Sequence, residues 1–239
     1  MEMKICHLYP EIMNLYGDAG NLKCIEKRLE WRGIHCHITT AGMGEKPDFS
    51  EYDLVFIGSG REEELRVVAP DMAENKAENL RSAVESGVAV LAIGGGFELL
   101  GNYLDCADGS RLKLAGVLDM HTIAGEERHT GNYMFSSDFG DVVAFENHSG
   151  TTHLGSDLQP LGKIICGFGN KGNGAEGARY KNAFGSYGHG PLLPKNPALC
   201  DGIIAAALSR RNGSIELAPL DDSIELEAHY YMVQRLSKN

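Results

Sequence analysis

The first 105 residues alternate between short apolar runs and amphipathic stretches. Apolar runs that end at glycine or polar turns predict strands, and apolar residues spaced three or four apart predict helices. Strands are predicted at residues 3–9, 34–39, 53–60 and 88–93, and helices at 21–32 and 61–86, the latter broken at Pro70. Strands alternating with helices predict a mostly parallel central sheet with helices on both faces. The expected fold class is therefore α/β.

Beyond residue 105 the pattern changes to short strands separated by glycine turns. Helices return at 196–211 and 222–236. We find no internal repeat and no linker that would divide the chain. We therefore predict a single domain over residues 1–239, in which antiparallel strands extend the parallel sheet.

Composition narrows the choice of partners. The formal net charge of -11 disfavours nucleic acid and anionic membrane surfaces. No apolar run approaches the roughly 18 residues of a membrane span, and the first residues lack the pattern of a signal peptide. Six scattered cysteines without a CxxC pair predict reduced thiols in a cytoplasmic protein. His35 and His37 lack a third ligand at a suitable spacing, so we predict no metal site.

Two predicted strands end in glycine turns, Gly58-Ser59-Gly60 and Gly94-Gly95-Gly96. In open parallel sheets, function gathers at the carboxyl ends of strands, where backbone N–H groups can hold an anion or a developing oxyanion. Taken alone, each turn is better explained by tight chain reversal. Neither turn matches a P-loop or a dinucleotide motif, so the chain itself predicts no nucleotide cofactor.

Polar residues near other predicted strand ends are further candidates. His189 lies between glycines, ahead of two prolines, and we expect it to be exposed at the mouth of a loop. Glu146, Asn147 and His148 follow another apolar run. Their side chains fit two roles that the sequence does not separate, orienting a polar substrate or capping a turn.

Several segments together resemble the class I glutamine amidotransferases of the cobyric-acid-synthase-like branch, and within it the GatD-type glutaminase subunits. The segments are NLYGDAGN (14–21), FIGSGREEE (56–64), LAIGGGFELLG (91–101), RHTG (128–131), FENHSG (145–150) and EGARYKNAFGSYGHGPLLPKN (176–196). The resemblance implies a subunit that releases ammonia from L-glutamine. A MurT-like Mur ligase partner in a heterodimer would use this ammonia to amidate the D-glutamate of the lipid II stem peptide. ATP and Mg²⁺ are expected on the partner, and no cofactor on this chain.

The resemblance also implies roles for single residues in catalysis. Gly94 stands at the nucleophile position, where the family carries a cysteine, and His189 at the position of the activating histidine. Backbone N–H groups near Ser59 or Gly60, and that of Gly95, would form the oxyanion hole.

Other positions would hold the substrate. Arg128 matches an arginine expected to bind the glutamine carboxylate through both oxygens. Glu98 replaces the family glutamine four residues after the nucleophile, and Asn147 and His148 belong to the same expected binding set.

Gly94 is the main departure from the family. Glycine cannot form the thioester through which a cysteine releases ammonia, so we predict no useful hydrolysis of glutamine by this chain. An engineered change, a natural loss and a sequence error all remain open as origins of Gly94. Two alternative functions also remain: a non-catalytic regulatory or scaffold subunit of the same complex, or the amidotransferase part of a cobyric-acid-type synthase. The stand-alone length favours the Mur-ligase arrangement.

Overall fold

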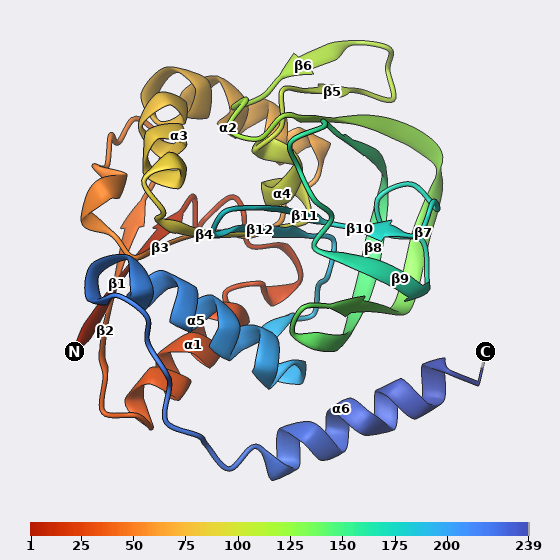
Figure 1. Ribbon diagram of the computed structural model, residues 1–239. Helices are drawn as coiled ribbons and strands as arrows, with labels where there is room; N and C mark the ends of the chain where they lie inside the picture. Colours follow the sequence, from red (N-terminus) through yellow and green to blue (C-terminus); the bar gives the residue numbers. More distant parts are fainter. Residues whose placement is uncertain (239) are drawn as a thin grey trace.

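The computed structural model describes residues 1–238, which fold around two six-stranded sheets (Figure 1). The helices are α1 Gly20–Glu30, α2 Glu62–Asn75, α3 Ala77–Glu85, α4 Gly95–Leu99, α5 Pro197–Asn212 and α6 Ser223–Leu236. The strands are β1 Glu2–Leu8, β2 His35–Ala41, β3 Leu54–Ile57, β4 Ala89–Ile93, β5 Tyr103–Asp105, β6 Arg111–Lys113, β7 Met120–Ser137, β8 Gly140–Leu154, β9 Gly162–Cys166, β10 Ala175–Glu176, β11 Ala178–Tyr180 and β12 Ala183–Ser186. Short 3₁₀ turns lie at η1 Leu15–Gly17, η2 Phe49–Glu51 and η3 Leu193–Lys195.

The first sheet has the order β11-β12-β4-β3-β1-β2 and is parallel apart from β11. Its central strands β3 and β4 are buried throughout, as expected when helices cover both faces. Val55 and Val90 pack in the same core cluster as α2 and α3, whereas Phe56 and Leu91 pack with α1 and α5 (Figure 1). The predicted α/β class is confirmed.

The second sheet has the order β10-β9-β7-β5-β6, with β8 paired to β7. Only β11 extends the parallel sheet with an antiparallel strand, and the long strands β7 and β8 build a layer of their own. Residue Phe145 of β8 pairs with His189, which follows β12. This bridge brings the second sheet to the edge of the first sheet where the glycine turns lie.

One local prediction, the helix break at Pro70, was wrong. Pro70 does not break the helix, because it lies on the exposed side of α2 and the helix continues to Asn75. The break falls at Lys76 (φ -136, ψ -32), whose buried ammonium contacts Asp71 at 2.5 Å.

Among the described residues, no helix is both long and apolar enough to cross a membrane.

Candidate active site

Gly94 forms a sharp turn between β4 and α4. Its backbone angles, φ 52 and ψ -118, lie where residues with a Cβ are strained and glycine is not. The Gly94 N–H donates to the carbonyl of Ser186 at 2.8 Å, and its own carbonyl accepts from Glu98 N–H at 3.0 Å. The predicted strand–turn–helix geometry is therefore present.

The two glycine turns pack directly on one another. A Cβ on Gly95 would overlap the backbone carbonyl of Gly60, and a Cβ on Gly96 would meet that of Gly58. Glycine is thus required here by close approach of two backbones, not only by chain reversal. This contact sets the 58–60 turn over the first residues of α4.

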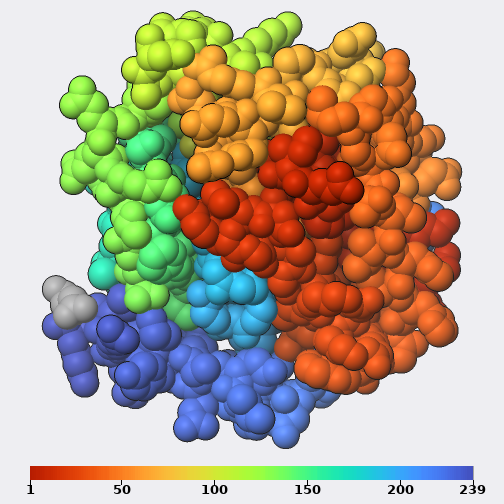
Figure 2. All heavy atoms as spheres, turned by 180° about the vertical axis from the view of Figure 1, so that it is seen from behind, coloured from red at the N-terminus to blue at the C-terminus, as the bar shows by residue number. Residues whose placement is uncertain are grey.

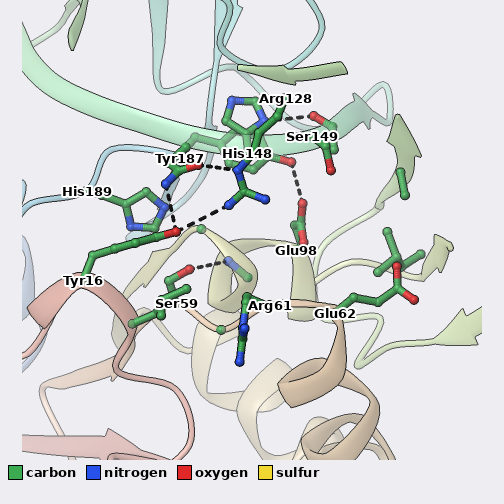
Figure 3. Close-up of a pocket in the computed structure, with 18 of the residues that line it drawn as sticks. Tyr16, Ser59, Arg61, Glu62, Glu98, Arg128, His148, Ser149, Tyr187 and His189 are labelled. Carbon is green, nitrogen blue, oxygen red and sulfur yellow. Dashed lines mark hydrogen bonds between the residues drawn. The ribbon is translucent and has the colours of Figure 1, made fainter. Parts of the chain in front are cut away.

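Ser59 connects these turns through hydrogen bonds. Its backbone N–H donates to Oδ2 of the buried Asp18 at 2.9 Å, and its Oγ accepts from Gly95 N–H at 3.1 Å (Figure 3). Two of the N–H groups expected in an oxyanion hole, those of Ser59 and Gly95, are therefore already paired within the chain.

His189 lies in the pocket, but the expectation that it is exposed was wrong. His189 is only 1% exposed. Its backbone N–H donates to the carbonyl of Phe145 in β8 at 2.8 Å, and this hydrogen bond holds the loop against the second sheet. The imidazole Nδ1 lies 3.5 Å from Oδ2 of Asp18, and the ring meets the Tyr16 ring edge-on with centroids 5.1 Å apart. Neither His189 Nδ1 nor Asp18 Oδ1 has a hydrogen-bond partner among the described residues. The histidine thus faces a buried carboxylate.

Arg128 reaches the pocket through an irregularity in β7. The pairing with β8 shifts between Ala124 and His129, so residues 125–128 bulge out of the ladder. A bulge bends the strand and re-aims side chains. Arg128 Nε donates to Asn147 Oδ1 at 2.6 Å, and Asn147 Nδ2 donates to the Tyr16 hydroxyl at 2.8 Å. The guanidinium is thereby held in the pocket, where Nη2 also donates to the Tyr16 hydroxyl at 3.4 Å (Figure 3).

Glu98 closes another side of the pocket. Its Oε1 accepts from the Tyr187 hydroxyl at 2.9 Å, and burial raises the pKa of its carboxyl. His148 stacks on the Tyr187 ring with centroids 3.8 Å apart, and its Nδ1 lies 3.0 Å from Gly150 O. His148 therefore supports the ring that contacts Glu98.

The sequence predicted that Asn147 and His148 lie at a strand end, and this was wrong. Both residues lie inside β8, which continues to Leu154. The strand is longer than the apolar run because its pairing with β7 extends past the polar residues. Asn147 contacts pocket residues and His148 is buried, so neither caps a turn.

One pocket of about 270 Å³ is lined by all the predicted site residues except Glu146, whose carboxylate accepts from the N–H groups of Phe168 and Gly169 instead. The predicted residues that line the pocket are Ser59, Gly60, Gly94, Gly95, Glu98, Arg128, Asn147, His148 and His189. On the surface, the first residues of the chain (red), the start of α2 (orange) and β7 (green) meet around a hollow (Figure 2). Tyr16, Asp18 and Tyr187 were not predicted, although each lies in a segment that carries the resemblance.

Residues 4–197 match the family model described as a CobB/CobQ-like glutamine amidotransferase domain. The chain belongs to this family. It is 34% identical over 239 residues to the subunit GatD of lipid II isoglutaminyl synthase (glutamine-hydrolyzing) from Staphylococcus aureus, covering 99% of this chain and 97% of that protein. The subunit of the same name from Streptococcus pneumoniae is 36% identical over 231 residues, covering 95% of this chain and 88% of that protein.

A solved glutamine amidotransferase from Thermotoga maritima shares the fold, with a TM-score of 0.55 and 16% identity over 99% of both chains. The pocket of this CobB/CobQ-like glutamine amidotransferase combines the Arg128 guanidinium, the Glu98 carboxyl and the His189 imidazole, which faces the carboxylate of Asp18. What it lacks at position 94 is any side chain.

One group of potential metal ligands lies at the edge of this pocket, namely Glu62, Cys106 and Asp108. Arg66 Nη2 contacts carboxylate oxygens of Glu62 at 2.7 Å and of Asp108 at 3.0 Å. The arginine is already paired with both carboxylates, so the group is explained as an ion-pair network at the surface.

Proposed function

We propose that this chain is the GatD-type, glutamine-binding subunit of a lipid II isoglutaminyl synthase. The observation that carries the proposal is that Arg128 lines the same pocket as the glycine elbow, the Glu98 carboxyl and the His189 imidazole. The names of the two GatD relatives, and their nearly complete coverage, support lipid II over a cobyric-acid precursor as the molecule that is amidated.

The pocket suits a zwitterionic amino acid. The guanidinium of Arg128 can hold both oxygens of the α-carboxylate of L-glutamine, and a carboxylate at Glu98 can face its α-ammonium group. The carboxamide then extends toward Gly94 and Gly95. Asn147 keeps Arg128 oriented through the 2.6 Å bond to Nε.

Chemistry at this carboxamide is limited by Gly94. In a thiol enzyme, a histidine takes the proton of the cysteine, the thiolate attacks the amide carbon, and ammonia leaves from a tetrahedral intermediate. His189, backed by Asp18, can move that proton, but residue 94 offers no atom to attack. We therefore propose that glutamine binds and is not hydrolysed at a useful rate.

The proposed partner is a MurT-like Mur ligase that forms a heterodimer with this chain and carries ATP and Mg²⁺. A cytoplasmic location belongs to the proposal, supported by six cysteines that are all free thiols. A regulatory role within the same complex is a second candidate, favoured by the combination of an intact binding pocket and Gly94.

Isothermal titration calorimetry with L-glutamine tests the binding, with L-norleucine as a control that lacks the carboxamide. Co-expression with the Mur-ligase-like protein of the same genome tests the partner, and an ammonia assay on the purified complex tests turnover. We expect glutamine binding, co-purification and no ammonia release. A chain that neither binds glutamine nor retains a partner would refute the proposal.

A further inference from the structure

The space beside Gly94 is filled. A Cβ built on Gly94 would lie less than 3.0 Å from Ser59 Oγ, and 2.6 and 2.8 Å from Cε1 and Nε2 of His189. Real Cβ atoms essentially never approach other atoms so closely. Ser59 is 3% exposed and His189 1% exposed, so both groups are enclosed around the point where a nucleophile's side chain would begin.

The Ser59 hydroxyl also accepts a hydrogen bond from the backbone N–H of Gly95. Gly95 N–H belongs to the residue after the nucleophile position, and such a donor stabilises the oxyanion in enzymes with a nucleophile elbow. Here it donates to Ser59 Oγ at 3.1 Å. A carboxamide oxygen must compete with this hydroxyl before it can use the donor.

The backbone of Ser59 is fixed on both sides. Its N–H donates to Asp18 Oδ2 at 2.9 Å, and its carbonyl accepts from Leu15 N–H at 2.9 Å. Asp18 is itself fully buried. Rotation about χ1 is therefore the main freedom left to the hydroxyl, and the backbone cannot withdraw it.

We infer that Ser59 and Gly94 form a matched pair that closes the hydrolytic half of the pocket. The Ser59 hydroxyl occupies the space of the missing side chain and satisfies the Gly95 N–H, so restoring a thiol at position 94 is insufficient for glutamine hydrolysis. A thiol at position 94 therefore needs Ser59→Ala beside Gly94→Cys, and the His189 ring must turn aside from the new Cβ. The inference rests on the proposed function, because it assumes that the pocket binds glutamine.

The first test is binding and needs no partner. Ser59→Ala removes Oγ and keeps Cβ, which leaves Gly95 N–H free for the carboxamide oxygen. We expect L-glutamine to bind about three- to tenfold more tightly to this variant in calorimetry, in line with one additional hydrogen bond. Ser156→Ala, an exposed serine outside the pocket, is the matched control and should bind as the unmodified chain does.

The second test is turnover in the complex with the Mur-ligase-like protein. We expect Gly94→Cys/Ser59→Ala to release ammonia at least about tenfold faster than Gly94→Cys alone, since a shift of 1.4 kcal/mol in the barrier already has this effect. Gly94→Cys/Ser156→Ala should match the single variant. Circular dichroism and thermal unfolding of each variant confirm that it is folded before its rate is compared.

Two outcomes would overturn the inference, and both leave the proposed binding of glutamine in place. One is a Gly94→Cys single variant as active as the double variant. The other is ammonia release by the unmodified chain that disappears in Ser59→Ala, because the hydroxyl would then act as a nucleophile instead of a plug. Absence of glutamine binding in every variant would instead refute the proposed function itself.

Discussion

The two sides of the pocket differ in how they are built. The ligand-holding side comprises Arg128, Asn147 and Tyr16, which are joined by side-chain hydrogen bonds, and Glu98, which accepts separately from Tyr187. The nucleophile side comprises Gly94, Gly95, Ser59 and His189, where backbones touch and a hydroxyl fills the space of a side chain. The first side is open to a ligand and the second is closed.

The side chains of the proposed binding role and the elbow thus come from different parts of the fold. The nucleophile side is made by turns of the parallel sheet, whereas Arg128 and Asn147 come from the second sheet. Because Arg128 and Asn147 rest on β7 and β8, we expect a change at position 94 to leave their hydrogen bond intact.

The largest expected effect tests how tightly the nucleophile side is packed. Gly95→Ala places a Cβ against the backbone carbonyl of Gly60, which cannot rotate away. We expect a loss of about 3 kcal/mol in the free energy of unfolding, measured by urea denaturation. Gly131→Ala is the matched control, because a Cβ there meets no atom within 4 Å. Equal stabilities of the two variants would contradict the close packing of the turns.

The next effect tests the ligand-holding side. Arg128→Ala should weaken L-glutamine binding about 30- to 100-fold, since hydrogen bonds to charged groups are worth about 1.5–3 kcal/mol. Calorimetry measures the affinity, and Arg235→Ala on the exposed side of α6 is the control. Unchanged affinity in Arg128→Ala would remove the arginine from the proposed binding role.

A smaller effect concerns the acid of the ligand-holding side. Burial raises the pKa of Glu98 above its ordinary value of 4.5, so between that value and the raised one the folded state binds more protons than the unfolded state. Stability due to this carboxyl therefore falls as the pH rises through that window. Glu98→Gln should unfold about 2–4 °C higher than the unmodified chain at pH 8, and the gain should vanish below pH 4.5.

Thermal unfolding across this pH range measures that trend. Glu176, whose pKa burial also raises, is present in both proteins and cancels in the comparison. A gain in Tm that does not depend on pH would mean that packing, not the proton of Glu98, causes it.

The smallest effect tests the contact between the two sides. Tyr16→Phe removes the hydroxyl that accepts from Asn147 at 2.8 Å and leaves the ring beside His189. We expect L-glutamine to bind about two- to fivefold more weakly, because the hydroxyl that accepts from Asn147 Nδ2 at 2.8 Å and from Arg128 Nη2 at 3.4 Å no longer orients these groups. Tyr231→Phe, an exposed tyrosine of α6, is the control in the same titration.

The sequence by itself determined the α/β class, the two glycine turns and part of the set of residues that line the pocket. These features depend on local periodicity, on the backbone freedom of glycine and on motifs that carry a family resemblance, all of which can be read along the chain. Even the departure at Gly94 was visible, since it concerns one position in one motif.

Only the tertiary structure decided what surrounds those residues. Ser59 and Gly95 are 36 positions apart, and Asn147 and Tyr16 are 131 apart, so no local pattern encodes either hydrogen bond. The burial of His189 depends on a bridge to β8, and β7 and β8 form a second sheet because they pair with each other and not with β11. Packing between distant segments thus placed the Ser59 hydroxyl where a nucleophile's side chain would begin.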